Sequence, residues 1–250
     1  MTPHQQPPRT APPHAAPPRV LLVEDDPISR SFLAAALAAV PAEVDAADSV
    51  AAAVALASSQ DYALWMIDAR LPDGSGSELL ARLREKHPHT PALAHTAAHE
   101  STILDALLAA GFGEALVKPM PAATVQAAVR RLLGLSGGPA RIDAVADDGP
   151  LPLWDYEAAA RALNGNRTHV DTLRGLFAQE LPKSLQAITD ASARGDSDAM
   201  RADLHRLRAS CGFVGALRLG SAVEALHREP ASAGLREAFV QAARETMDSL

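Results

Sequence analysis

Residues 19–27 read RVLLVEDDP, an apolar run that ends in three consecutive carboxylates and a proline. A continuous apolar run, without alternation, is typical of a parallel strand that is covered on both faces. Asp26 and Pro27 have an ordinary structural use, because aspartate is a good helix N-cap and proline suits the first helical position. Glu24 and Asp25 have no such use, and adjacent carboxylates repel one another unless a cation lies among them. The stretch therefore predicts a buried strand, a helix after it, and a cationic partner where the two meet.

The pattern of strand and helix repeats as far as residue 135. The other candidate strands are residues 43–47, 63–68, 91–96 and 114–118, and the helical stretches are 27–40, 49–58, 75–86, 101–110 and 121–133. Such alternation predicts a doubly wound α/β fold with a five-stranded parallel sheet. Ligands of open parallel sheets bind at the carboxyl ends of the strands, so a site is expected at that edge.

A different pattern follows residue 135. Residues 134–153 are rich in Gly, Pro and Asp, which is typical of a linker, and we place the linker at 136–152. Amphipathic helices fit residues 154–163, 167–193, 197–211, 216–228 and 234–248. Their short connections predict an all-α four-helix bundle over residues 153–250. Pro-rich residues 1–18 lack the apolar centre of a signal peptide and are expected to form a disordered tail.

The composition of the 250-residue chain limits its partners. Its 48% hydrophobic and 21% charged content is ordinary for a folded protein, and a single cysteine excludes an internal disulfide or a cysteine-rich zinc site. The formal charge of −7 argues against nucleic acid, because phosphate binding needs a basic face. No apolar run reaches the length that crosses a membrane. We therefore expect a cytoplasmic protein without a nucleic-acid partner or a membrane insertion.

Polar side chains stand at the ends of four of the predicted strands. Glu24 and Asp25 follow the first strand, Asp68 ends the third, Thr96 the fourth and Lys118 the fifth. Two or three carboxylates form a hard oxygen site of the kind that Mg²⁺ accepts. Asp68 would then act as a nucleophile toward a phosphoryl group, with Mg²⁺, Lys118 and the Thr96 hydroxyl stabilising the charge on the phosphoryl oxygens.

Four motifs, VLLVEDDP, MIDARLPDGSG, HTA and LVKPM, occur in this order along residues 19–135. In these motifs and their spacing the segment resembles the response-regulator receiver domain, a flavodoxin-like fold. The resemblance implies that Asp68 is the phosphoacceptor. It also implies that a Mg²⁺ site is formed by Glu24, Asp25, Asp68 and the main-chain carbonyl of Arg70. Thr96 and Lys118 would form a phosphate-sensing pair.

Residues 203–213, DLHRLRASCGF, place a histidine in a basic field and small side chains one turn later. On a helix, five residues share one face beside the apolar stripe: Arg201, His205, Arg208, Ala209 and Gly212. His205 is therefore expected to be exposed, with the small residues clearing the surface on one side of it. The arginines would hold phosphoryl oxygens, or meet the acidic rim of a receiver such as the carboxylates at 24–26.

The segment HRLRASCGFVGA, residues 205–216, and its lead-in ARGDSDAMRADL resemble the histidine-containing phosphotransfer (Hpt) domain. The resemblance implies that His205 carries a phosphoryl group, with support from Arg201, Arg208, Ala209 and Gly212. A neutral imidazole nitrogen attacks an aspartyl phosphate to give a phosphoramidate, which a second aspartate attacks in turn. The alternative is a surface histidine without a role.

The two resemblances together imply a two-component phosphorelay protein and not an enzyme in the usual sense, with self-catalysed phosphoryl transfer and autodephosphorylation at most. Asp68 would accept phosphoryl from a sensor histidine kinase, and His205 would pass it to or from a receiver aspartate, for which a downstream response regulator is a candidate. Two alternatives stay open: a phosphate sink or branch point with independent sites, and an interaction module gated by phosphorylation. If the sites exchange phosphoryl within one chain, the acidic rim is expected to dock on Arg201 and Arg208.

Overall fold

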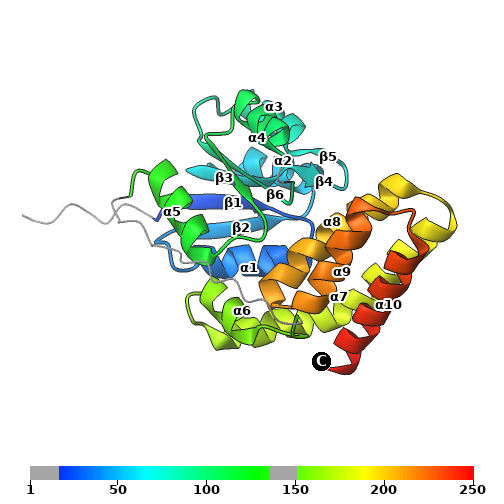
Figure 1. The fold of residues 1–250 in the computed structure, drawn as a ribbon. Coiled ribbons are helices and arrows are strands. Elements are labelled where there is room, and N and C mark those ends of the chain that lie inside the picture. The colour runs from blue at the N-terminus through cyan, green and yellow to red at the C-terminus, as the bar shows by residue number, and fades with distance from the viewer. Residues whose placement is uncertain (1–16, 99, 136–150) are drawn as a thin grey trace, which may run out of the picture.

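The computed structural model describes residues 17–98, 100–135 and 151–250. The expectations for the tail at 1–18 and for the linker at 136–152 therefore fall almost entirely outside the described residues. Two parts pack against each other, a sheet enclosed by helices and a bundle of helices (Figure 1). Within the described ranges, no helix combines the length and the apolar character needed to cross a membrane.

The first part is built on a five-stranded sheet in which every neighbouring pair of strands is parallel. Its strands, in spatial order, are β2 (Glu43–Ala47), β1 (Arg19–Val23), β3 (Leu64–Asp68), β6 (Ala92–Thr96) and β7 (Glu114–Val117). This arrangement confirms the predicted doubly wound α/β fold. It also brings the carboxyl ends of β1, β3, β6 and β7 to one edge, where the polar strand-end residues collect.

Helices cover both faces of this sheet (Figure 1). One face carries α1 (Pro27–Leu37) and α5 (Ala122–Leu132), and the other carries α2 (Val50–Ser59), α3 (Gly76–Arg84) and α4 (Ser101–Ala109). Strand β3 is buried along its whole length, which explains why its sequence does not alternate. Asp26 caps α1 as predicted, because its carboxylate accepts the Ser29 N–H at 2.7 Å.

A short antiparallel pair, β4 (Arg70–Leu71) and β5 (Gly74–Ser75), is absent from the sequence prediction. Strands of two residues are too short to show a period. The pair follows β3 directly and leads into α3, whose first residue, Gly76, lies against the strand end. A Cβ at Gly76 would be 2.3 Å from the carbonyl oxygen of Asp68, so only glycine lets α3 begin this close to β3.

The second part consists of α7 (Arg167–Ala193), α8 (Ser197–Val214), α9 (Leu217–Arg228) and α10 (Ala233–Asp248), preceded by the short α6 (Tyr156–Ala162). The predicted bundle is confirmed, since α8 packs on α7 and α9, and α10 packs on the same two helices. Helix α8 runs beyond its predicted end at residue 211 and stops at Gly215, which adopts the left-handed conformation with φ of +73°. His205 lies near the middle of α8.

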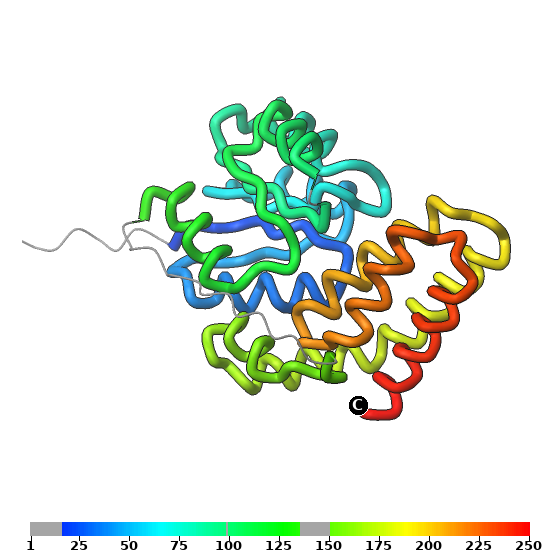
Figure 2. Tube along the Cα trace, in the orientation of Figure 1, coloured from blue at the N-terminus to red at the C-terminus, as the bar shows by residue number. Residues whose placement is uncertain are grey.

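Helices α1, α7 and α8 lie side by side where the two parts meet (Figure 2). The two parts share one continuous apolar core along these helices. The rings of Phe32 on α1 and Phe213 on α8 stack with their centroids 4.1 Å apart, and both side chains are buried. A second contact joins α5 to the α6–α7 turn, where the Asn164 amide donates to Gln126 at 3.3 Å. Because α1 begins at the carboxyl end of β1, packing α8 on α1 places α8 beside the strand-end residues.

Candidate functional site

A buried group of charged side chains lies at the carboxyl ends of β1, β3 and β7. Lys118 donates from Nζ to Glu24 Oε2 at 2.7 Å and to Asp68 Oδ2 at 2.5 Å. All three side chains are almost fully buried. Two carboxylates thus hold the Lys118 ammonium out of water, which gives the acidic strand ends the cationic partner that the sequence predicts.

Burial and charge set the protonation of this group. Burial alone would raise the pKa of Asp68, but the Lys118 ammonium and the Arg70 N–H, which donates to Asp68 Oδ1 at 2.8 Å, help to lower it below its ordinary value. Burial raises the pKa of Glu24 well above its ordinary value, although Lys118 opposes the shift. Burial would lower the pKa of Lys118, but the two carboxylates outweigh this and raise it. Asp68 is therefore ionised and paired with Lys118 at neutral pH.

These side chains open into a cavity of about 170 Å³ that α8 closes on its far side. Its lining includes Asp25, Asp68 and Lys118 from the sheet part, and His205 and Ala209 from α8. The cavity therefore has room for several waters or for a phosphoryl group. The fold therefore brings the two predicted phosphoacceptors, far apart in sequence, to one shared cavity.

Asp25 lines the cavity, whereas Thr96 does not. Asp25 is half-buried and lines the cavity, and burial followed by the charge of Asp68 raises its pKa. Thr96 is buried, its Oγ1 accepts the Ala98 N–H at 3.1 Å, and it is not among the lining residues. The structure thus brings Asp25 to the candidate site but leaves the Thr96 hydroxyl engaged beside it.

His205 is half-buried, whereas the sequence predicts an exposed side chain. The residue lies off the apolar stripe of α8 as predicted, but the sheet part docks over it. Burial, Arg70 and then Arg208 lower the pKa of His205 to about 4. At neutral pH the imidazole is therefore neutral, which is the form that attacks an acyl phosphate.

Arg201 and Arg208 do not meet the acidic rim, and this part of the docking prediction is wrong. Arg201 donates to the carbonyl oxygen of His227 at 3.0 Å, and Arg208 donates to the carbonyl oxygen of Ala97. The physical reason for the first contact is that His227 lies in the last turn of α9, where free carbonyls attract cations. The second contact still ties α8 to the sheet part, but through the backbone at the end of β6.

Arg206 and Ser210 meet the acidic rim instead. Arg206 Nη1 lies 3.5 Å from Asp25 Oδ2, and the Ser210 hydroxyl donates to Asp26 Oδ2 at 3.2 Å. About half of the Arg206 side chain is exposed, so this ion pair stabilises docking by at most about 1 kcal/mol. Neither residue belongs to the predicted helix face. The docking surface of α8 is therefore wider than that face.

Small residues on α8 allow the close approach, as predicted for Ala209 and Gly212. Ala209 is buried and lines the cavity. A Cβ at Gly212 would lie 2.5 Å from Cγ and 2.7 Å from Cβ of Pro119, in the loop after β7. Such distances exclude any side chain, so docking, and not helix geometry, requires the glycine.

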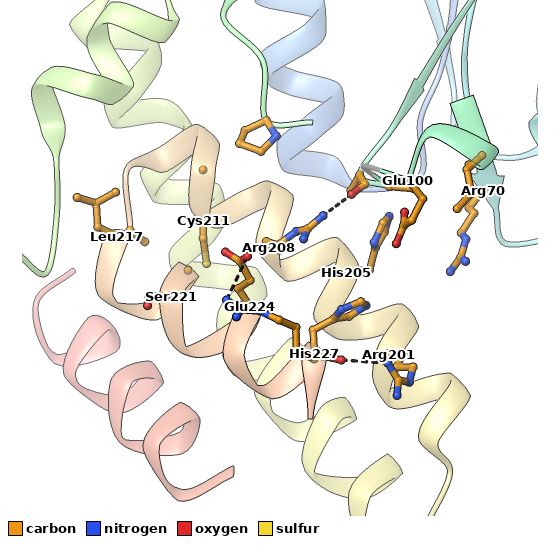
Figure 3. A pocket seen from close by; sticks show the side chains of 18 of the residues that line it. Arg70, Glu100, Arg201, His205, Arg208, Cys211, Leu217, Ser221, Glu224 and His227 are labelled. Carbon is orange, nitrogen blue, oxygen red and sulfur yellow. Dashed lines mark hydrogen bonds and ion pairs between the residues drawn. The ribbon is translucent and has the colours of Figure 1, made fainter. Parts of the chain in front are cut away.

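A groove of about 890 Å³ runs between the two parts on the other side of His205 (Figure 3). Six charged side chains line it: Arg70, Glu100, Arg201, Arg208, Glu224 and Arg228. His205 lines both the groove and the cavity, and its ring centroid lies 6.2 Å from that of His227. The groove therefore leaves the imidazole a route to solvent in the docked arrangement.

One residue of this site was missed by the sequence analysis. His95 lies opposite Asp68 in the pairing of β6 with β3, and its ring is fully buried. Its Nδ1 lies 3.4 Å from Glu24 Oε2 and 3.7 Å from Asp68 Oδ2. The only signal is a histidine just before Thr96 in the otherwise apolar run PALAHT, and the register that aims its ring is a property of the folded sheet.

Comparison with known families agrees with this geometry. Residues 20–130 match the sequence model of the response regulator receiver domain, and residues 172–250 match that of the Hpt domain. The chain joins a receiver domain to an Hpt domain. Both domains are of the kinds that two-component phosphorelays use.

The chain is similar to segments of larger proteins. It is 29% identical to sensor histidine kinase AruS of Pseudomonas aeruginosa over 214 residues, which cover 84% of this chain and 21% of the kinase. It is 25% identical to sensor protein TorS of Escherichia coli over 218 residues, which cover 87% of this chain and 23% of TorS. The chain thus spans less than a quarter of the length of these two relatives.

A solved structure resembles the receiver domain alone. The receiver domain of sensor histidine kinase PA1611 from Pseudomonas aeruginosa is 30% identical, with a TM-score of 0.44 over 48% of this chain and 99% of that domain. That structure is described as holding a magnesium ion coordinated in its active site cleft.

The low pKa of His205 gives a first prediction. An NMR titration of the full chain should show its imidazole titrating near pH 4, and a Gly212→Leu variant, in which the domains cannot dock closely, should titrate nearer to 6.5. Because the pKa is lowered in the docked state, His205 favours docking above pH 6.5, and this contribution is lost as the pH falls toward 4. An unchanged pKa in the variant would show that the bundle alone, and not the receiver domain, buries the ring.

Proposed function

We propose that this protein relays phosphoryl groups between Asp68 of its receiver domain and His205 of its Hpt domain, within one chain. In this role Asp68 takes the group from a sensor histidine kinase, and the chain exchanges it with the receiver aspartate of a downstream response regulator. The observation that carries the proposal is the cavity between the two domains that both side chains line. Two sites that work independently would have no need to face each other.

The transfer step uses groups that already surround the cavity. A ring nitrogen of neutral His205 attacks the phosphorus of the Asp68 acyl phosphate, forming the P–N bond as the bond between phosphorus and the Asp68 oxygen breaks. The electron pair leaves with Asp68, which becomes a carboxylate again, while the proton on the other ring nitrogen of His205 stays in place. Lys118 stabilises the released carboxylate, because its ammonium already contacts Asp68 Oδ2 at 2.5 Å.

The acidic group fits a hard divalent cation. We assign the Mg²⁺ site to Glu24, Asp25, Asp68 and the main-chain carbonyl of Arg70, a set made only of oxygen donors. The charge of Asp68 helps to raise the pKa of Asp25, and a cation would relieve this repulsion. Magnesium bound there would stabilise negative charge on the phosphoryl oxygens.

Lys118 is proposed to sense the phosphoryl group. Thr96 would join it by donating its hydroxyl hydrogen, which stays available while Oγ1 accepts the Ala98 N–H. Three residues are proposed to support transfer by allowing α8 to lie against the receiver domain: Arg208, Ala209 and Gly212. Arg201 is proposed to support it by fixing α8 to the end of α9.

Exchange with other proteins requires the two domains to part. In the docked arrangement the Hpt domain covers Asp68 and the receiver domain covers His205, so the surfaces that a kinase or a second receiver would contact are occupied. The proposed partners are therefore proteins that compete for these docking faces, and neither nucleic acid nor a membrane is among them. We propose that these exchanges take place in the cytoplasm, where a reduced thiol such as that of Cys211 is stable.

Labelling with radioactive acetyl phosphate tests the function. The wild-type protein should carry an alkali-labile aspartyl label and an alkali-stable histidine label, and both should require Mg²⁺. Asp68→Asn should carry neither, and His205→Gln should carry only the aspartyl label. His227→Gln is the matched control, because its ring neighbours that of His205 but does not line the cavity, and it should behave as wild type. Histidine label in Asp68→Asn, or label that survives chelation of divalent ions, would contradict the proposal.

A further inference from the structure

His95 is a buried imidazole for which phosphoryl transfer supplies no task. Its ring has no exposed surface, and neither ring nitrogen makes a well-formed hydrogen bond, although the backbone of Val23 lies near enough to affect its pKa. Leaving a buried polar group without a partner costs about 1–3 kcal/mol. An apolar side chain in β6 would avoid this cost, so the ring points to a ligand.

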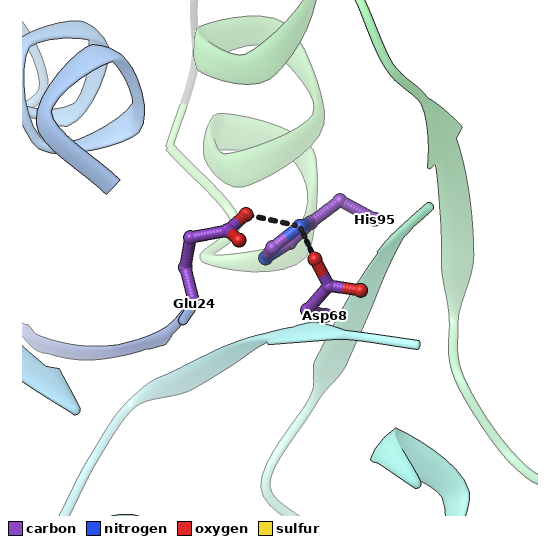
Figure 4. A group of neighbouring side chains, drawn as sticks. All are labelled: Glu24, Asp68 and His95. Atoms are coloured by element: carbon purple, nitrogen blue, oxygen red, sulfur yellow. Dashed lines mark ion pairs between the residues drawn. The ribbon is translucent and has the colours of Figure 1, made fainter. Parts of the chain in front are cut away.

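The ring is aimed between two carboxylates (Figure 4). Nδ1 of His95 lies 3.4 Å from Glu24 Oε2 and 3.7 Å from Asp68 Oδ2, and one donor atom from each residue lies within 4.8 Å of the others. Ligands about 2.1 Å from a tetrahedral zinc ion are about 3.4 Å apart. The three side chains, held by the ends of β1, β3 and β6, therefore have nearly the spacing of a metal-ligand set.

The donor atoms indicate which metals would bind. Burial and then Lys118 lower the pKa of His95 to about 3, so the ring is neutral at neutral pH and keeps a nitrogen lone pair. One imidazole with two carboxylates suits Zn²⁺ and Co²⁺, whereas Mg²⁺ prefers oxygen ligands alone. His95 thus adds a nitrogen ligand beside the oxygen ligands that we assign to Mg²⁺.

We propose that Glu24, Asp68 and His95 form a binding site for a borderline transition-metal ion such as Zn²⁺ or Co²⁺. The ion would take the place of the Lys118 ammonium, which contacts the same two oxygens, Glu24 Oε2 and Asp68 Oδ2. Metal bound there occupies the phosphoacceptor and displaces the lysine that stabilises it. Asp68 then cannot be phosphorylated. The metal ion would thus regulate the proposed phosphorelay, a property beyond phosphoryl transfer itself.

Cobalt binding to the full-length chain, followed by its visible absorption, tests this site without any phosphoryl transfer. Wild type should bind Co²⁺ in competition with Zn²⁺, and His95→Leu should weaken Co²⁺ binding at least about tenfold while changing Mg²⁺ binding by no more than about twofold. His87→Leu is the matched control, because His87 Nδ1 also lies near a carboxylate, 3.6 Å from Asp61, but outside the site. Lys118→Met removes the competing charge and should strengthen Co²⁺ binding. Equal Co²⁺ affinity in wild type and His95→Leu would overturn the proposal.

A direct measurement on wild type answers the same question if His95→Leu fails to fold. With isotope-labelled histidine and an NMR-active cadmium isotope as the probe, a coupling between the metal and Nδ1 of His95 is expected. Saturation with cadmium without that coupling would overturn the site. The outcomes stay separate from those of the phosphorelay, because loss of Mg²⁺-dependent label on Asp68 contradicts only the proposed function.

Discussion

Replacing Gly212 with leucine is expected to slow phosphoryl transfer between Asp68 and His205 at least about a hundredfold, because displacing reacting groups by about 1 Å can have such an effect. The helix itself tolerates the change, since leucine is a better helix former than glycine. The docked receiver domain does not tolerate the change, because even a Cβ at Gly212 would lie 2.5 Å from Cγ of Pro119. The ring of proline is rigid, so the domains must separate. Rapid quenching after a pulse of acetyl phosphate measures the rate.

Gly175→Leu supplies the matched control for this prediction. Gly175 lies inside α7, and a Cβ there would meet nothing within 4 Å. Both variants replace a glycine within a helix, so both should stabilise their helix by up to about 1 kcal/mol. Only Gly212→Leu should impair transfer. Wild-type transfer in Gly212→Leu would show that the docked arrangement is not the one in which phosphoryl moves.

Phe32→Ala and Phe213→Ala are each expected to lower the free energy of unfolding by about 3–5 kcal/mol. The two rings come from different domains, stack with centroids 4.1 Å apart and are buried. Each truncation leaves a cavity in the apolar core that the domains share. In the double variant the loss should be smaller than the sum by about 0.5–1.5 kcal/mol, the interaction of an aromatic pair. Denaturant unfolding of the two single variants and the double variant measures this coupling.

Phe239→Ala tests whether such coupling is specific to the interface. Phe239 is equally buried, but it lies on α10, which packs on α7 and α9 within the Hpt domain. The losses in free energy of unfolding caused by Phe239→Ala and Phe32→Ala should therefore add, with no interaction energy between them. Full additivity between Phe32→Ala and Phe213→Ala would mean that the domains are not packed together in solution.

The sequence predicts much of the fold because each signal is local. Continuous apolar runs mark the strands, Asp26 with Pro27 marks the start of α1, and helical periodicity marks all of α7 between residues 167 and 193. The sequence predicts for the same reason that the carboxylates and Lys118 meet. Each ends a parallel strand, and the carboxyl ends of parallel strands lie at one edge.

Contacts between distant segments escaped the prediction. The half-buried state of His205 depends on a receiver domain that begins nearly two hundred residues earlier, and no pattern within α8 encodes that cover. Arg206 meets Asp25 because α8 packs on α1, and the spacing of residues along one helix does not contain that contact. His95 reads as an irregularity in an apolar strand until its register places it opposite Asp68.

Dilution tests transfer within one chain most directly. Asp68 is loaded by a short pulse of acetyl phosphate, and the first-order rate constant for the appearance of alkali-stable label on His205 is then measured over a hundredfold range of protein concentration. Transfer between two domains that are already docked predicts a rate constant that does not change on dilution, and no histidine label when Asp68→Asn and His205→Gln chains are mixed at the lowest concentration. A rate constant that falls in proportion to concentration, or histidine label that appears only in such mixtures, would contradict the internal relay.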